Sequence, residues 1–202
     1  GVTRPTFEEY PNRRNKESLV TFFPQNNEFR YTAQDLMDFF EKNHANNILL
    51  INPDNPSGNF IPLKDVCMLA DWCEKKGVRL IVDESFVDFS VGWENNTLLH
   101  DCTLEAYPHM LVMKSISKSY GVPGIRLGIL CSADIEIIFQ IKQMVSIWNI
   151  NSFCEFFMQI YTKYEKDYIC ACKKFIKERH DFEMKLRQIS YLRVIPSQAN
   201  YF

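Results

Sequence analysis

The 202-residue sequence lacks several features that mark common classes of protein. It has no apolar run long enough to cross a bilayer, and its first residues lack the apolar core of a signal peptide, so neither a membrane span nor secretion is indicated. Its 23 basic and 25 acidic residues nearly cancel and are interspersed, which leaves no basic stripe for nucleic acid. We therefore expect small molecules or copies of the same chain as partners.

Disulfide and metal chemistry are also poorly supported. The seven cysteines are odd in number and include no C-x-x-C pair, and the four histidines are scattered without the spacing of metal ligands. This cysteine usage fits a reducing, cytoplasmic environment best. The sequence predicts no metal site, and it contains no internal repeat or low-complexity segment.

What the sequence does contain is an alternation of short apolar segments with amphipathic ones. The segments of strand length are SLVTF (18–22), NNILLIN (46–52), VRLIVDE (78–84), HMLVMKS (109–115) and RLGILC (126–131). Helices are predicted after Thr32, which has Asp35 as its capping-box partner, from the proline at position 62 to Gly77, and over most of 133–187. The alternation predicts an α/β fold with a mostly parallel sheet flanked by helices.

The helical stretch also suggests how the chain divides into domains. We expect residues 1–150 to form part of a large domain and 151–188 to form connecting helices. The segment 189–202 turns β-like again and stops without a turn or cap, so it is expected to begin a smaller, truncated α/β domain. The chain is therefore expected to be part of a longer protein.

Three of the predicted strands end in residues that can do chemistry. N-P-D-N-P-S-G follows the second strand, D-E-S-F follows the third, and S-I-S-K (115–118) follows the fourth, before a G-V-P-G turn and Arg126. Each motif alone is more often structural: a turn, a helix cap or a solvated lysine. Because ligands bind beyond the carboxyl ends of parallel strands, their shared placement favours one site.

In this order the motifs resemble those of the class I and II aminotransferases, pyridoxal-phosphate enzymes of the aspartate-aminotransferase fold. N-P-D-N-P-S-G is similar to the family's N-P-x-N-P-T-G, V-D-E-S-F to its D-E-A-Y or D-E-A-F, and S-x-S-K with G-x-R-x-G to its lysine motif. The branch it resembles most is that of histidinol-phosphate aminotransferase and threonine-phosphate decarboxylase. PTFEEY near the start and PSQANYF at the end also look like family segments.

The resemblance implies pyridoxal 5'-phosphate as the cofactor and a role for each matching residue. Lys118 would form the Schiff base with the cofactor aldehyde and shuttle the substrate's α-proton, and Asp83 would bind the protonated pyridine nitrogen. Asn55 would donate to the phenolic oxygen. The phosphate cup would include Ser115, Ser117 and Arg126.

Phe86 departs from much of the family, which has a tyrosine at this position. The loss of that phenol donor is expected to raise the pKa of the imine, and phenylalanine resembles the threonine-phosphate decarboxylase side of the branch. Family members are also dimers whose sites borrow residues from the partner subunit, so a homodimer is expected.

Three functions stay open at this point. The first is a pyridoxal-phosphate aminotransferase that moves an amino group between a small amino acid or amine, possibly phosphorylated, and a 2-oxo acid. The second is a decarboxylase of an O-phospho amino acid, which uses the same imine. The third is a non-catalytic module of a larger polypeptide, against which the intact set of Asn55, Asp83, Lys118 and Arg126 argues.

Overall fold

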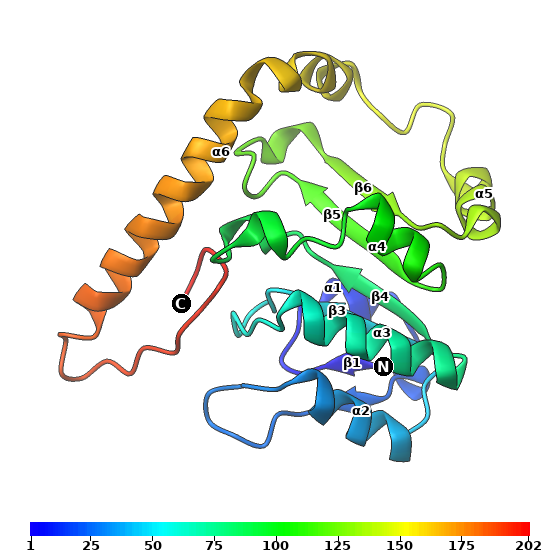
Figure 1. Ribbon diagram of the computed structural model, residues 1–202, viewed down its shortest axis with the longest axis horizontal. Coiled ribbons are helices and arrows are strands. Elements are labelled where there is room, and N and C mark those ends of the chain that lie inside the picture. The colour runs from blue at the N-terminus through cyan, green and yellow to red at the C-terminus, as the bar shows by residue number, and fades with distance from the viewer.

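The computed structural model describes all 202 residues and has one six-stranded sheet with helices packed around it (Figure 1). The strands lie in the order β2-β1-β3-β4-β5-β6. Their bounds are Val2–Thr3 (β1), Thr21–Phe22 (β2), Asn47–Ile51 (β3), Arg79–Asp83 (β4), Leu111–Ile116 (β5) and Leu127–Cys131 (β6). All neighbours pair parallel except β5 and β6, which pair antiparallel. The predicted mostly parallel α/β fold is confirmed.

The helices match the sequence signals where local capping rules apply. Their bounds are Glu9–Asn12 (α1), Ala33–Lys42 (α2), Leu63–Lys76 (α3), Asp101–Ala106 (α4), Ile135–Met144 (α5) and Ser152–Leu186 (α6). Thr32 and Asp35 form the predicted capping box at the start of α2. Gly77 ends α3 with φ 65°, a left-handed conformation that glycine adopts without steric cost.

The core lies between the sheet and the two helices α2 and α3. Alternate residues of β3 and β4 point toward these helices and are fully buried against them. The largest of the buried aliphatic side chains are Leu36, Ile48, Leu50, Leu69, Leu80 and Val82. This packing fixes the positions of β3, β4 and β5, whose carboxyl ends carry the three motifs.

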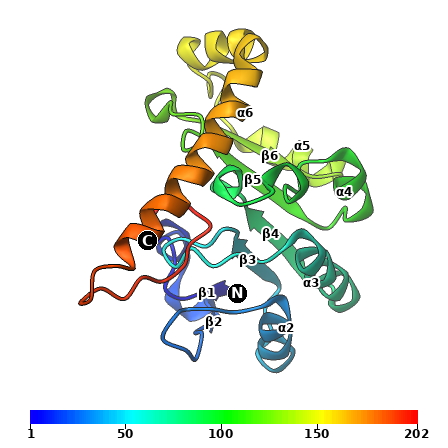
Figure 2. The same ribbon diagram turned by 60° about the vertical axis from the view of Figure 1, so that its left-hand side comes forward.

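The long helix α6 passes the end of the sheet toward which the parallel strands point (Figures 1 and 2). It contacts the 3₁₀ turn Val87–Phe89 (η2), which directly follows the D-E-S-F motif. α6 therefore lies beside the edge of the sheet where a ligand would bind. None of the helices combines the length and the apolar character that a membrane span needs.

The β-like segment at the end of the chain forms no strand. Residues 191–202 instead return to the N-P-D-N-P-S-G loop, beside which they lie in Figure 2. The backbone N–H of Gln198 donates to the carbonyl of Gly58 at 3.0 Å, and the Tyr201 hydroxyl donates to the carbonyl of Asp54 at 2.7 Å. Gly58 has φ +68°, and a Cβ there would lie 2.1 Å from the hydroxyl of Ser197. The domain boundary near residue 189 stays a prediction.

Candidate functional site

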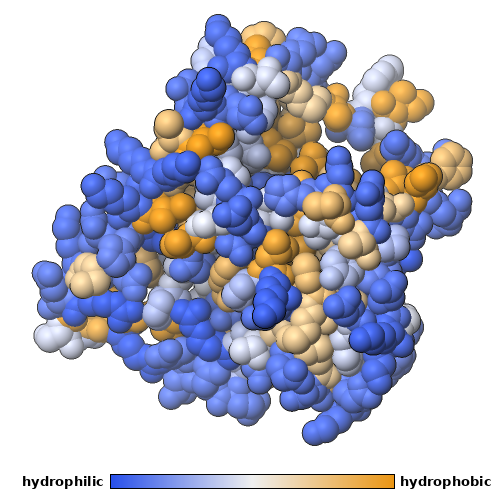
Figure 3. Space-filling view, in the orientation of Figure 1, coloured by the Kyte–Doolittle hydropathy of each residue, from blue (hydrophilic) through white to orange (hydrophobic).

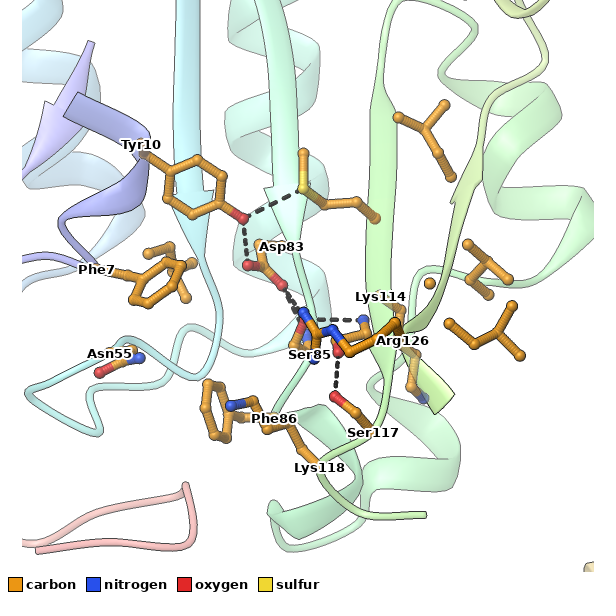
Figure 4. Close-up of a pocket in the computed structure, with 17 residues that line it drawn as sticks. Phe7, Tyr10, Asn55, Asp83, Ser85, Phe86, Lys114, Ser117, Lys118 and Arg126 are labelled. Carbon is orange, nitrogen blue, oxygen red and sulfur yellow. Dashed lines mark hydrogen bonds between the residues drawn. The ribbon is translucent and has the colours of Figure 1, made fainter. Parts of the chain in front are cut away.

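One pocket of about 540 Å³ lies at the carboxyl ends of β3, β4 and β5, with residues from β6 on its far wall (Figure 4). Phe7, Ile51 and Met113 supply apolar surface to it. All seven site residues predicted from the sequence line it: Asn55, Asp83, Phe86, Ser115, Ser117, Lys118 and Arg126. Segments up to 71 residues apart in the sequence (Asn55 to Arg126) therefore meet at one place.

Asn55 is presented by a loop that is closed at its base. The Asn52 side chain donates to the carbonyl of Ile61 and accepts from its N–H, each at 2.8 Å, which joins the two ends of the loop. The Asn55 side chain is half-buried and makes no hydrogen bond within the protein. Its amide is thus free to bind a ligand in the pocket.

Asp83 is the last residue of β4 and is held by three donors. Its Oδ1 accepts from the N–H and the hydroxyl of Ser85 at 2.9 and 2.5 Å, and its Oδ2 accepts from the hydroxyl of Tyr10. A carboxylate has about four acceptor positions, so roughly one remains for a ligand. The carboxylate lines the pocket although Asp83 is only 8 % exposed. It can therefore pair with a cationic N–H group inside the pocket.

A second polar region of the pocket carries hydroxyls and a guanidinium. The hydroxyls of Ser115 and Ser117 hydrogen-bond to each other, and the N–H of Ser115 donates to the hydroxyl of Ser85 at 2.9 Å. Arg126 has φ 60° and donates only to the carbonyl of Pro123, at 3.2 Å. Most of its guanidinium donors are therefore free, and this group together with the serine hydroxyls suits an anion such as a phosphate.

Lys118 lines the same pocket and lies beside Phe86 (Figure 4). Its side chain is exposed to the pocket and has no hydrogen bond or ion pair within the protein. Its Nζ lies 5.6 Å from the centre of the Phe86 ring, which packs edge-on against Tyr201 at 5.3 Å between centroids. Phe86 therefore offers an apolar face beside a primary amine that is free to react.

Three further residues of the site were not predicted from the sequence: Tyr10, Ser85 and Lys114. Tyr10 reaches Asp83 from α1, and burial together with the charge of Asp83 raises the pKa of its phenol, so it remains a hydrogen-bond donor. Tyr10 belongs to the PTFEEY segment, which the sequence marked as family-like without indicating a contact. Ser85 lies inside the D-E-S-F motif, where its bonds to Asp83 and Ser115 join β4 to β5.

Comparison with known proteins gives a consistent picture. The family model described as "Aminotransferase class I and II" matches residues 2–202. The chain is 32 % identical over 202 residues to L-serine phosphate decarboxylase of Sulfurospirillum multivorans, covering 98 % of this chain and 51 % of that protein. It is 27 % identical over 177 residues to a histidinol-phosphate aminotransferase of Ruminiclostridium cellulolyticum, covering 88 % of this chain and 47 % of that protein.

The solved structures agree with the sequence matches. A decarboxylase from Sulfurospirillum multivorans superimposes with a TM-score of 0.85 and 31 % identity, covering 98 % of this chain and 57 % of that one. The chain spans between one third and about one half of the length of the curated relatives that it matches.

Proposed function

Because the chain belongs to the class I and II aminotransferase family, whose cofactor is pyridoxal 5'-phosphate, we propose that its pocket holds this cofactor and serves the decarboxylation of a small O-phosphorylated amino acid. The resemblance of the three motifs to this family is confirmed. The observation that carries the proposal is the meeting, in one pocket, of a free lysine, a carboxylate and an anion-binding region.

The donor set of the pocket fits the cofactor group by group. Asp83 has an acceptor position left for the N–H of a pyridinium ring. The unpaired amide of Asn55 suits a phenolate oxygen, and the hydroxyls of Ser115 and Ser117 with the guanidinium of Arg126 suit a phosphate dianion. The chemistry that the cofactor supplies when bound is an electron sink for the pair left when a bond to the substrate's α-carbon breaks.

The protein's residues orient the reactants and move one proton. Lys118 would hold the cofactor through its aldehyde and, when the substrate amine takes that place, the freed amine of Lys118 would carry a proton to or from the α-carbon. In decarboxylation the carboxylate leaves as carbon dioxide, its electron pair stays on the α-carbon, and a proton from Lys118 replaces it. Asp83 would hold the ring nitrogen in its protonated form through a charge-assisted hydrogen bond.

Decarboxylation is the first candidate because of two observations. A relative at 32 % identity is named a decarboxylase of serine phosphate, and Phe86 stands where much of the family has a tyrosine. Transamination, the reaction that the sequence motifs suggested first, is the second candidate. It is favoured by the family description and by the histidinol-phosphate aminotransferases among the relatives. Both reactions need the same pocket.

The test separates these functions by product. The protein is incubated with pyridoxal phosphate and O-phosphoserine or O-phosphothreonine, with and without 2-oxoglutarate, and carbon dioxide and glutamate are measured. Carbon dioxide that requires Lys118 supports decarboxylation, and glutamate without carbon dioxide assigns transamination instead. No product and no cofactor absorbance would leave the non-catalytic module as the remaining function.

We also infer that two copies of the chain assemble. Apolar side chains gather over α5 and the loop that joins it to α6 (Figure 3), and Ile147 and Trp148 in that loop are 93 % and 91 % exposed. Exposed apolar side chains gathered in this way mark an interaction site, and the resemblance to the family implies a homodimer. Light scattering on the protein and on Trp148→Ser tests this: the variant should shift toward a monomer, and a wild-type monomer would contradict the inference.

A further inference from the structure

Lys118 is the first residue of a tight turn that directly follows β5. The backbone N–H of Gly121 donates to the carbonyl of Lys118 at 3.2 Å, which closes a four-residue turn. Ser119 and Tyr120 are therefore the two central residues of this turn. Because the hydrogen bond ties the two ends of the turn together, contacts that hold the central residues also restrict the backbone of Lys118.

One side chain of the long helix α6 holds both central residues. The hydroxyl of Tyr168 donates to that of Ser119 at 2.8 Å, and its ring stacks on Tyr120 with 4.3 Å between centroids and 7° between planes. Burial and the charge of Asp88 raise the pKa of the Tyr168 phenol, so it stays a donor. The Tyr168 ring also packs edge-on against Trp93, with 6.3 Å between centroids, so it holds the turn from a fixed position.

A buried carboxylate completes the contacts of Ser119. Asp88 belongs to η2 and is 0 % exposed, and its Oδ2 accepts from the Ser119 hydroxyl at 2.7 Å. Its Oδ1 is held in turn by the buried ammonium of Lys114 at 2.7 Å. The Ser119 hydroxyl therefore accepts from α6 and donates to η2, and its one donor proton is used. The turn is fixed between these two elements.

The side chain of Lys118 has no comparable contacts. It makes no hydrogen bond or ion pair within the protein, so the backbone of the turn decides where its amine can reach in the pocket. An amine adds to an aldehyde carbon through its lone pair and forms a C–N double bond, while the aldehyde oxygen leaves with two protons as water. Reacting atoms must lie about 3–3.5 Å apart, and a misplacement of about 1 Å can cost as much as a hundredfold in rate.

We propose that Tyr168 is a positioning residue for attachment of the cofactor to Lys118. It holds Ser119 and Tyr120, and through them the backbone from which the Lys118 amine extends. This inference rests on the proposed function, since it assumes an aldehyde in the pocket. It applies equally to decarboxylation and transamination, and it gives α6 a role at a pocket that none of its residues lines.

The experiment compares two ligands that differ only in the reacting group. Pyridoxal phosphate carries the aldehyde, whereas pyridoxine 5'-phosphate carries a hydroxymethyl group there and cannot form the C–N double bond. Calorimetry gives both dissociation constants for wild type and for Tyr168→Phe, which loses the hydroxyl but keeps the ring. For pyridoxal phosphate the constant should rise about two- to tenfold, because the turn must now be ordered when the amine attaches. For pyridoxine phosphate it should stay unchanged.

Further variants test whether the effect passes through the turn and Lys118. Ser119→Ala removes the same contact from the other partner, so it should repeat the ligand difference, and combining it with Tyr168→Phe should add nothing. In Lys118→Ala, Tyr168→Phe should leave the binding of pyridoxal phosphate unchanged, because no amine remains to be positioned. Tyr164→Phe is the matched control, since Tyr164 lies on the same helix, is 48 % exposed and makes no hydrogen bond through its hydroxyl.

The outcomes distinguish the two proposals. A rise in the dissociation constant for pyridoxal phosphate alone supports the role of Tyr168. An equal rise for both ligands, no rise for either, or a rise that persists in Lys118→Ala overturns that role and leaves the proposed function standing. No attachment to Lys118 in wild type, read by borohydride reduction and mass spectrometry, overturns the proposed function and this inference with it.

Discussion

Replacing Asn52 with alanine should destabilise the fold and loosen the loop that carries Asn55. Ile61 is 2 % exposed, and both its N–H and its carbonyl are satisfied by the Asn52 side chain at 2.8 Å. Asn52→Ala would leave these two buried backbone groups without partners. Each such group costs about 1–3 kcal/mol, so the pair should reduce the free energy of unfolding by about 3–4 kcal/mol.

The assay is thermal unfolding followed by circular dichroism. At about 2–4 °C per kcal/mol for a protein of this size, the Tm of Asn52→Ala should fall by about 6–16 °C. Asn52→Asp can still accept from the Ile61 N–H but cannot donate to its carbonyl when ionised, so its Tm should also fall. Asn27→Ala is the matched control, because Asn27 is exposed and its side chain makes no hydrogen bond.

The same variant tests the link from the loop to the site. Asn52→Ala should weaken the binding of pyridoxal phosphate, because Asn55 is no longer held at the pocket wall. A fall in Tm of less than about 2 °C would refute the reasoning, since it would mean that the Ile61 groups find other partners at little cost.

Three other predictions concern the helix cap, a buried acid and the aromatic wall of the pocket. Thr32→Ala should lower the free energy of unfolding by about 1 kcal/mol while Thr32→Ser keeps it, measured by urea unfolding; equal loss in both would contradict the capping role. Burial raises the pKa of Glu84 above 4.5 in the fold, so its contribution to stability is fully present below pH 4.5 and is lost as pH rises through the folded-state pKa. Unfolding curves should therefore show wild type losing stability relative to Glu84→Gln over that interval, and parallel pH dependences would disprove this. Phe86→Tyr adds a donor toward the cofactor's phenolic oxygen, so the pH midpoint of the bound cofactor's absorbance should fall by about one unit; an unchanged midpoint would show that the phenol does not reach it.

Much of the fold was readable from the sequence because local rules decide it. The capping box at Thr32 and the left-handed Gly77 fix one end each of α2 and α3 with side-chain and backbone chemistry of a few neighbouring residues. The candidate site residues were found for a related reason: they directly follow buried strands, and the carboxyl ends of parallel strands share one edge of the sheet.

The direction of β6 was not predicted, although a signal was present. The connection from Ile116 to Leu127 has ten residues, fewer than the dozen or more that a parallel crossover needs, so the antiparallel pairing follows from length rather than from composition. The expectation that the final segment turns β-like failed for another reason. Residues 191–202 have β-like composition, but a strand also needs a neighbour to pair with, and these residues pair with none of the six strands.

The contacts of Tyr10 and Asp88 could not be read from the sequence. Tyr10 meets Asp83 across 73 residues, and Asp88 meets Lys114 across 26. Such contacts depend on how the elements pack, and neither spacing nor periodicity encodes them. The Tyr10 contact helps to hold the carboxylate of Asp83, and the Asp88 contact holds Lys114 on β5, just before the S-I-S-K motif.

The return of residues 191–202 to the N-P-D-N-P-S-G loop sets an order of assembly during synthesis. The contact between Tyr201 and Asp54 closes 147 residues of chain, among the longest separations in the structure. During synthesis the sheet, Lys118 and α6 leave the ribosome before residues 197–201. Tyr201, in that later segment, contacts both the loop that carries Asn55 and the ring of Phe86. The pocket therefore lacks its contacts on that side until residues 197–201 have emerged, and firm capture of the cofactor has to follow their emergence.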